Sequence, residues 1–451
     1  MERARYLTLS YRWGDGNDPS RTTALNLKQR TRAIHLADLP RTIQDAILVT
    51  RSLRMRYIWI DAVCIIQSSE NDPGDFDIEG RKMAAYYSNS YCTIAATSAD
   101  DAAEGFLRPR GAEEHETTLI KGFPVPEISW VGDIIAASMH SRGWVLQERA
   151  LSRRTLHWGR EQLWWECEHQ RACEMFPQGR ITGLSEFDQP YMKARGWLAG
   201  MTSETDLWPT WASLAEAYNG MDLAREADRL IALQGLADVV LQRFPSEKYF
   251  FGLWGSTLQQ QLCWKVDGYY QLTSPAAGPP TPCPAPSWSW ASCLHLISYQ
   301  TDECTHLPQH ALARFLGHEM DPSDPNACAL RFQGNLQRAP FTKWKRWGNS
   351  TQVDRDATDE YRYTVWLDDP PDDDNSPGMA RLDMLLMAGS YSEDTDEDED
   401  EDEQKYDMRF LVITPVAGEA SRYRRVGLAT CWAPNRHWRP SDAVDAEVCL
   451  I

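Results

Sequence analysis

Short apolar segments alternate with amphipathic segments through the first hundred residues, and this alternation limits the fold more than any other feature of the chain. Residues 6–11 (Tyr-Leu-Thr-Leu-Ser-Tyr) predict a buried strand, and residues 57–60 predict a second one that continues after Asp61 through residues 62–66. A third strand is predicted over residues 91–97, and a helix over Ile78–Ser88. Pro40 suits the first turn of another helix, whose apolar face repeats at intervals of three and four: Ile43, Ala46, Ile47, Thr50 and Leu53.

This order of elements indicates the α/β class. Strands that alternate with helices form a parallel sheet joined by right-handed crossovers. In such a sheet, ligands bind beyond the carboxyl ends of the strands. The loops that follow Ser10 and Ile60 should therefore lie at the same edge of the sheet.

The rest of the chain predicts a different organisation. Aromatic-rich strands are expected at residues 155–158 and 162–167, helices at 211–218 and 229–240, and strands at 384–387 and 410–413. We predict a parallel-sheet domain over residues 1–150, a mixed α+β region rich in tryptophan over 151–300 and packed on it, and a β-rich region over 301–451.

The charge of the chain argues against two classes of partner. Lys and Arg number 46 against 65 Asp and Glu, which gives a net charge of −19. Ten acids lie in the run Glu393–Glu403, so the rest of the chain still carries −19 + 10 = −9. The run predicts a disordered, self-repelling surface loop near residues 391–405. A nucleic-acid binder needs a basic face, and an anionic membrane needs a polybasic segment, so we expect neither partner.

Compartment and metal content follow from the apolar runs and the cysteines. No apolar stretch approaches the roughly 18–20 residues that span a bilayer, and residues 1–10 lack the apolar core of a signal peptide. The eleven cysteines are odd in number and contain no Cys-x-x-Cys pair, which favours a reducing, cytoplasmic location. Cys167, His169 and Cys173 have no second ligand pair nearby, so we expect no metal.

Polar residues gather where the predicted strands end. Ser10, Arg12, Trp13 and Gly14 follow the first strand, Asp61 and Cys64 follow the second, and Glu79 opens the helix after an acidic loop. A parallel sheet would bring these groups together. Plainer interpretations stay open: Gly14-Asp15-Gly16 lacks the third glycine of a dinucleotide fingerprint and suits a plain turn, Asp61 suits an Asx turn or a salt bridge to Arg12, and Glu79 suits a helix start.

Several ordered blocks resemble one family. They are Tyr6–Gly14, Leu39–Ile47, Tyr57–Gln67, Glu79-x3-Met83-x3-Tyr87, Thr93–Ala96, Arg142–Glu148 (Arg-Gly-Trp-Val-Leu-Gln-Glu), Leu151-Ser-x-Arg154 and Gln162–Cys167, with weaker blocks at Asp228–Leu230, Gly235–Ala237, Pro286–Ser292 and Tyr423–Leu428. This set resembles the fungal heterokaryon-incompatibility (HET) domain family, over about residues 6–150 for the domain proper.

The resemblance implies a role in fungal non-self recognition (allorecognition), in which such proteins trigger programmed cell death when incompatible strains fuse. A partner incompatibility protein or self-association is then expected. The family is also similar to TIR domains of innate immunity, which have a flavodoxin-like parallel sheet. Some TIR domains hydrolyse NAD with a glutamate on a helix after a central strand, and by chain order Glu79 is the nearest match. NAD would be a substrate, and no bound cofactor is predicted.

The implied chemistry assigns a role to each candidate. Cleavage of the nicotinamide–ribose bond develops positive charge on the ribose, which the carboxylates of Glu79 and Asp61 would stabilise or orient. Arg12 would hold the pyrophosphate and Trp13 would stack on a ring, with Ser10, Gly14 and Cys64 beside them. For Trp13, Trp59 and Trp144, a place in the packed core is favoured over a site role, because buried tryptophans dominate packing.

Two alternatives stay open. The polar residues of the Arg142–Arg154 block, namely Gln147, Glu148, Arg149, Ser152 and Arg154, favour a buried structural network over a site role. The whole domain could also be a non-catalytic signalling module that assembles with itself or with a partner.

Overall fold

In the computed structural model, the chain forms two compact units. The first comprises Met1–Thr202, Met221–Leu223 and Ile231–Arg243, and the second comprises Ser203–Gly220, Ala224–Leu230 and Phe244–Ile451. The structure describes residues 4–14, 19–69, 72–109, 117–120, 123–126, 130–167, 170–179, 201, 203, 206–271, 283–293, 295–299, 310–339, 344–347, 350–353, 363–368, 382–391, 406–419, 421–433 and 443–451.

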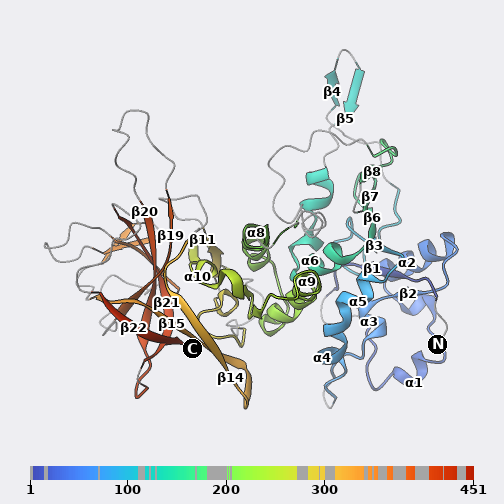
Figure 1. Ribbon diagram of the computed structural model, residues 1–451. Coiled ribbons are helices and arrows are strands. Elements are labelled where there is room, and N and C mark those ends of the chain that lie inside the picture. Colours follow the sequence, from blue (N-terminus) through green and yellow to red (C-terminus); the bar gives the residue numbers. More distant parts are fainter. Residues whose placement is uncertain are drawn as a thin grey trace. The chain divides into compact units, whose positions relative to one another are not determined.

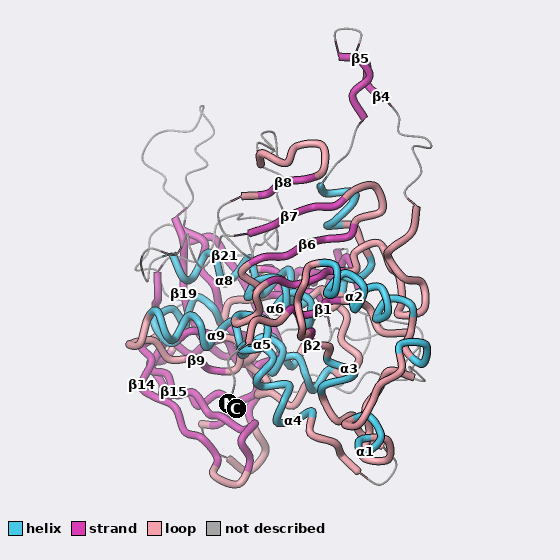
Figure 2. Tube along the Cα trace, turned by 90° about the vertical axis from the view of Figure 1, so that its right-hand side faces the viewer, coloured by secondary structure: helices cyan, strands magenta, loops and turns pink. Residues whose placement is uncertain are grey.

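A mostly parallel sheet organises the first unit (Figures 1 and 2). Its described strands follow the order β2-β1-β3-β6-β7-β8. Strand β1 pairs in parallel with β2 and β3, and β3 pairs in parallel with β6, whereas β7 and β8 join by antiparallel pairing. The predicted α/β class with a parallel core sheet is confirmed. The strands are β1 (Leu7–Ser10), β2 (Ile58–Trp59), β3 (Cys92–Ala95), β6 (Arg154–Trp158), β7 (Leu163–Cys167) and β8 (Arg171–Cys173).

Helices connect these strands. The predicted helix after Pro40 is α2 (Arg41–Ser52), and it buries Ile43, Ala46 and Val49 against the sheet because these positions share one face. The other described elements of the connections are α1 (Leu27–Arg30), η1 (Leu36–Asp38), α3 (Asp61–Cys64), α4 (Phe76–Glu79), η2 (Gly80–Lys82), α5 (Met83–Ser88), the hairpin β4 (Thr117–Ile120) and β5 (Phe123–Pro126), η3 (Val131–Ile135), η4 (Ser138–Ser141), α6 (Gly143–Leu151) and α9 (Arg229–Arg243).

Two local predictions are wrong. Residues 62–66 do not continue the second strand, because the N–H groups of Val63 and Cys64 bond to the carbonyl of Ile60 and close the short helix α3. A short apolar run does not distinguish a strand from a buried helical turn. The helix predicted from Ile78 begins at Phe76, since the carbonyl of Asp75 accepts from the N–H groups of Ile78 and Glu79. Glu79 is therefore the last residue of α4 and does not open a helix.

The core of the first unit lies between the sheet and α2. Its fully buried apolar side chains include Leu9, Ile43 and Ile94, and Trp13 packs against it in a partly buried position. Two buried hydroxyl contacts cross the sheet: Thr8 Oγ1 to Thr93 Oγ1 at 2.8 Å, and Thr93 Oγ1 to Ser152 Oγ at 2.5 Å. The β1–β3–β6 region is thus fixed by apolar packing and by polar pairing.

A large, mainly antiparallel sheet dominates the second unit (orange and red in Figure 1). The predicted strands at 384–387 and 410–413 lie within β19 and β20, and the helix predicted at 211–218 lies within α8. The other predicted helix, at 229–240, lies within α9, most of which belongs to the first unit. Strands and helices of this unit are α8 (Leu207–Asn219), η7 (Glu226–Asp228), β9 (Tyr249–Phe250), β10 (Leu253–Trp254), η8 (Gly255–Thr257), α10 (Leu258–Gln261), β11 (Lys265–Gln271), η9 (Trp290–Ser292), β12 (His295–Ser298), β13 (His310–Ala311), β14 (Arg314–Asp321), β15 (Asp324–Ala339), β16 (Trp344–Trp347), β17 (Ser350–Val353), β18 (Tyr363–Leu367), β19 (Leu382–Tyr391), β20 (Tyr406–Pro415), β21 (Arg422–Ala433) and β22 (Val444–Leu450).

Several tryptophans lie in the interior of the second unit. Trp211, Trp254, Trp264, Trp288 and Trp290 are all fully buried. The strand-rich character of the later chain is confirmed, whereas the three-part division into 1–150, 151–300 and 301–451 stays a prediction. The acidic run Glu393–Glu403 lies outside the described residues.

Candidate functional site

The carboxyl ends of β1 and β3 mark the point where the sheet changes its direction of winding. Strand β2 lies on one side of β1, and β3 and β6 lie on the other. Such a switch point is where open α/β sheets bind ligands, because the loops diverge to opposite faces. Ser10 is the last residue of β1, and Asp61 follows β2 at the same edge, as predicted.

A buried glutamate occupies this edge. Glu148 lies on α6, all of whose residues are buried, and its own exposed fraction is 3%. Ser10 Oγ donates a hydrogen bond of 2.5 Å to Glu148 Oε2. Tyr87 on α5 also hydrogen-bonds to this carboxylate, and its hydroxyl lies 3.0 Å from the carbonyl oxygen of Leu9. We call Ser10, Asp61, Tyr87, Arg142 and Glu148 the Glu148 cluster.

Electrostatics set the charge state of this cluster. The pKa of Glu148 is raised to about 7, mainly by burial and in smaller part by the charge of Asp61, against the lowering effects of Arg142, Ser10 and Tyr87. Arg142 is held by a hydrogen bond of 2.6 Å from Nη1 to the carbonyl of Tyr11. Because the pKa of Glu148 lies near neutrality, this carboxyl group exchanges a proton in the physiological pH range, a property typical of groups that act as acids or bases in catalysis.

Asp61 pairs with a tryptophan. Trp13 Nε1 donates to Asp61 Oδ2 at 2.8 Å, and the N–H of Ala62 donates to Oδ1 at 2.8 Å. The second contact reaches only the next residue, whereas an Asx turn reaches two residues further along the chain, so the Asx turn stays a prediction. Arg12 is exposed. The pKa of Asp100 is lowered mainly by a hydrogen bond from Ser138 and then by Arg160, and the charge of Arg12 makes a smaller contribution in the same direction. The structure thus brings Ser10, Trp13 and Asp61 to one edge, and the described charge effect of Arg12 is on Asp100.

Gly14 and Cys64 have weaker claims to a site role. A side chain added at Gly14 would meet nothing within 4 Å, so the position does not require glycine for packing. Cys64 is exposed, and the pKa of its thiol is raised, mainly by desolvation and also by the charge of Asp61. The Cys64 thiol is therefore protonated at neutral pH, unlike an activated nucleophile.

Glu79 makes its described contacts within its own helical segment. Its Oε1 accepts from Lys82 Nζ at 2.7 Å, and its Oε2 accepts a hydrogen bond from the Tyr86 hydroxyl. These two bonds lower the pKa of Glu79, with that of Lys82 the stronger. Tyr86 in turn stacks on Trp59, with ring centroids 4.9 Å apart. Glu79 is a charged, paired carboxylate, and its catalytic role stays a prediction.

The comparison with family models decides the identity of this segment. Residues 6–148 match the family model described as Heterokaryon incompatibility protein (HET). Residues 6–148 are a HET domain. The match begins one residue before β1 and ends at Glu148, so it includes both partners of the Ser10–Glu148 hydrogen bond. No curated protein and no solved structure matches the chain.

The end of the HET domain leads into a buried ionic network. Arg149 donates from Nε and Nη2 to the two carboxylate oxygens of Glu166 at 2.9 and 3.0 Å, and His157 Nε2 lies 3.3 Å from the same carboxylate. Gln147 Oε1 accepts from the N–H of Gly235 at 3.1 Å. The block after Arg142 therefore includes the predicted structural network, but Glu148 itself faces β1. Sequence reasoning missed Glu148 as a site residue, although its block ends the HET-like pattern.

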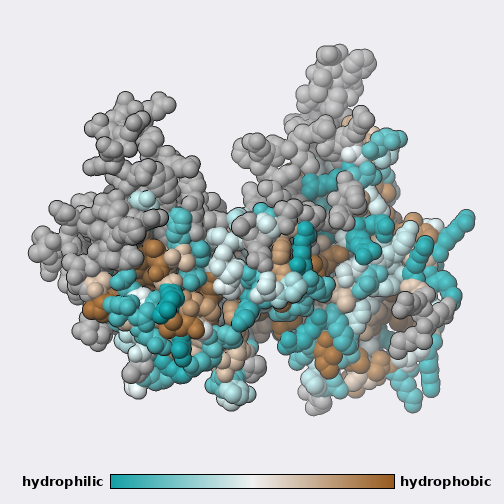
Figure 3. Space-filling model, viewed as in Figure 1, coloured by the Kyte–Doolittle hydropathy of each residue, from teal (hydrophilic) through white to brown (hydrophobic). Residues whose placement is uncertain are grey.

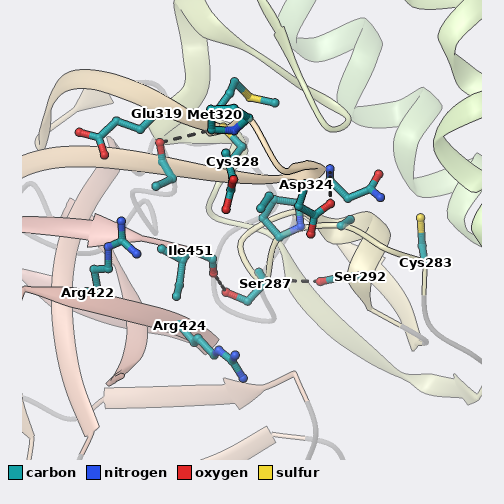
Figure 4. Close-up of a pocket in the computed structure, with 17 residues that line it drawn as sticks. Cys283, Ser287, Ser292, Glu319, Met320, Asp324, Cys328, Arg422, Arg424 and Ile451 are labelled. Carbon is teal, nitrogen blue, oxygen red and sulfur yellow. Dashed lines mark hydrogen bonds between the residues drawn. The ribbon is translucent and has the colours of Figure 1, made fainter. Parts of the chain in front are cut away.

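The second unit contains a cavity that Figure 4 shows. It measures about 830 Å³, and among its lining residues are Cys283, Ser287, Ser292, Asp324 and Arg424. Ser287 comes from the family-like block Pro286–Ser292, and its Oγ donates to the carbonyl of Ile451. The lining carries both acids and arginines, so its charge does not select one class of ligand.

None of the described helices is both long and apolar enough to cross a bilayer. Within the same residues, no three His, Cys, Asp or Glu side chains gather as metal ligands would, and His169 lies outside them. Hydrophilic residues predominate among the coloured residues on the face that Figure 3 shows. Exposed apolar side chains such as Leu25 and Val444 lie far apart in the sequence.

Proposed function

We propose that this chain is a cell-death effector of fungal non-self recognition, and that its HET domain hydrolyses NAD at the Glu148 cluster. One observation carries the proposal: a buried carboxylate with a pKa of about 7 accepts a hydrogen bond from Ser10 at the switch point of a parallel sheet. NAD-cleaving enzymes need such a carboxylate where positive charge develops on the ribose.

If the HET domain is TIR-like, as we propose, Glu148 is favoured over Glu79 as the catalytic carboxylate. The strand order β2-β1-β3-β6 agrees with the start of the flavodoxin-like order. The catalytic glutamate of NAD-cleaving TIR domains lies on a helix after a central strand. Helix α6 follows β3, a central strand, and carries Glu148, whereas Glu79 lies on α4 after the edge strand β2.

The chemistry needs few groups. Water replaces nicotinamide at the ribose C1′, which gives ADP-ribose, nicotinamide and a proton. The carboxylate of Glu148 would stabilise the cationic ribose and bond to its hydroxyls, and Ser10 and Tyr87 would hold that carboxylate in place. Nicotinamide leaves as a neutral molecule, so no strong acid is required. Trp13 offers a ring for stacking, and Arg12 a charge for the pyrophosphate.

Burial sets a condition on this activity. Ser10, Tyr87 and Glu148 are all nearly inaccessible to solvent. A ribose would reach Glu148 only after neighbouring side chains move, and the partly buried Trp13–Asp61 pair is the best candidate to do so. Activity would then depend on a trigger that opens the site, which suits a protein that must stay silent until strains fuse.

The same burial favours a second function. If the cluster never opens, the hydrogen bond between Ser10 and Glu148 fixes α6 to the sheet, and the HET domain acts as a non-catalytic module that assembles with itself or with a partner. In that case cell death would follow from assembly, and NAD would stay intact.

Incubation of the purified chain with NAD separates the two functions. Nicotinamide release is measured by chromatography for the wild type, for Glu148→Gln, for Glu79→Gln and for the exposed control Asp77→Asn. We expect Glu148→Gln to lower turnover by about 100-fold or more, as loss of a catalytic group does, and Asp77→Asn to leave it unchanged.

Three outcomes would count against parts of the proposal. Loss in Glu79→Gln with activity retained in Glu148→Gln would transfer the catalytic role to Glu79. An equal rate in all variants would point to a contaminating enzyme. If no turnover occurs at high protein concentration while fungal expression still kills cells, and Glu148→Gln also kills, the assembly function replaces the enzyme.

A further inference from the structure

A pocket at the opposite edge of the same sheet has a uniform charge. It measures about 380 Å³ and is lined by Ala4, Arg5, Ser88, Asn89, Ser90, Tyr91, Arg153 and Arg154. Three of these side chains are arginines, and no acidic side chain lines the pocket. We propose that this pocket, which we call the arginine pocket, binds a small anion that carries two or more phosphate groups.

The topology places the arginines where three parallel strands begin. Arg5 precedes β1, Tyr91 precedes β3, and Arg154 is the first residue of β6. Since the strands are parallel, their amino ends meet at one edge and their carboxyl ends at the other. A strand of four residues is roughly 13 Å long, so the arginine pocket is separate from the Glu148 cluster.

Tyr91 holds two of the guanidinium groups in position. The Cζ atoms of Arg5 and Arg154 lie 5.2 and 5.3 Å from the centre of its ring. Arg154 Nη1 also donates to the carbonyl of Tyr91 at 3.1 Å. Both cations thus lie over a neutral aromatic ring, and Arg154 also bonds to a carbonyl; none of these contacts neutralises their charge.

The charge of this pocket is uncompensated within the described residues. Arg5, Arg153 and Arg154 form no ion pair there, whereas Arg149 and Arg425 are each paired with a carboxylate. Like charges that are gathered in a concave site repel one another and attract an anion. Planar guanidinium groups bond to phosphate oxygens in pairs, which favours phosphate over a simple halide.

The size of the pocket limits the ligand. A cavity of about 380 Å³ lies near the lower end of the range for small-molecule sites, about 300–1,000 Å³. It suits a pyrophosphate, a triphosphate or the phosphate end of a nucleotide. The chain as a whole is strongly acidic, so a long nucleic acid would be repelled beyond the pocket.

Calorimetric titration of the full chain with tripolyphosphate at low salt tests this inference. We expect saturable binding to one site. Arg5→Gln, Arg153→Gln and Arg154→Gln should each weaken the affinity by roughly tenfold, the effect of losing one charged hydrogen bond. The matched control Arg51→Gln removes an exposed arginine from α2 and should change the affinity less than about twofold. Glu148→Gln should leave binding unchanged, so the result does not depend on NAD hydrolysis.

A second titration with ATP identifies the source of the phosphates. Equal affinity for ATP and tripolyphosphate indicates recognition of the phosphates alone, and tighter binding of ATP indicates a nucleotide ligand with its base near Tyr91. The inference is overturned if tripolyphosphate releases no heat at millimolar concentration and gives no thermal shift, if Arg51→Gln weakens binding as much as the pocket variants do, or if only a single-stranded oligonucleotide binds. If a glutamine variant does not fold, Arg154→Lys keeps the charge and should bind with intermediate affinity.

Discussion

Ser10 at the end of β1 donates a hydrogen bond to Glu148, a residue 138 positions further along the chain. This contact joins the first strand of the HET domain to the helix that ends the family match. Because both side chains are buried, the energy of this contact depends strongly on the protonation state of the carboxyl group. Glu79, in contrast, is more exposed, so its energy should depend less on protonation.

Replacement of Ser10 by alanine should destabilise the protein by about 1–3 kcal/mol, because Glu148 loses a hydrogen-bond donor in a buried site. The same change should raise the pKa of Glu148 above its value of about 7, since the bond from Ser10 lowers it. Urea unfolding between pH 5 and pH 9 would measure both effects. A mutant that matches the wild type at every pH would show that the bond is not formed in solution.

Glu148→Gln should change how stability depends on pH. The carboxyl group has a pKa of about 7 in the folded protein and about 4.3 when unfolded, so between these values the folded state binds more protons. Wild-type stability should therefore fall as the pH rises from about 4.5 to 8, by up to roughly 3 kcal/mol. Glutamine cannot ionise, so the stability of the variant relative to that of the wild type should increase over that pH range. Parallel stability curves would contradict the raised pKa.

Glu79→Gln should have a weaker effect on the pH dependence of stability, and of opposite sign to that of Glu148→Gln. The pKa of Glu79 is lowered by Lys82 and Tyr86, so its contribution is present at neutral pH and is lost as the pH falls through the folded pKa. The pair with Lys82 is partly exposed, which limits the loss to about 1 kcal/mol or less. Thermal melts at pH 3.5 and pH 7 check this, with Asp77→Asn as the control. A loss of several kcal/mol would mean that Glu79 has a buried partner.

Glu166→Gln should destabilise the first unit by about 3–5 kcal/mol, because it removes the carboxylate that pairs with buried Arg149. Arg171 lies 3.6 Å from the same carboxylate and is more exposed, so Arg171→Gln should cost about 1 kcal/mol or less. The comparison uses urea midpoints for the two variants. Equal losses would contradict the assignment of Arg149 as the main partner of Glu166.

Much of the fold could be predicted from the sequence because its signals are local. The strand at Leu7–Ser10, the face of α2 and the strand at Cys92–Ala95 each follow from apolar spacing over a few residues. The helical turn at Asp61–Cys64 could not be predicted in this way, since it depends on a carbonyl that accepts two N–H groups instead of a neighbouring strand.

The candidate site was only half predictable for a related reason. Ser10, Trp13 and Asp61 were expected at one edge because parallel strands bring their carboxyl ends together. Glu148 was instead expected in a structural network. Its place beside β1 could not be predicted, because it depends on the path of the long connection between β3 and β6. Chain order favoured Glu79, and only the three-dimensional strand order shows that β3, not β2, is central.

The boundary of the family match does not coincide with the boundary of the sheet. The match ends at Glu148, yet β3 is bordered by β6, which begins at Arg154, and β7 and β8 continue the sheet to Cys173. A fragment cut at the end of the match would leave the backbone groups of β3 unpaired along one side. Such an exposed strand edge pairs readily with other chains and promotes aggregation. Experiments on the isolated domain should therefore keep the chain through at least Cys173, or toxicity caused by misfolding will be mistaken for biological killing.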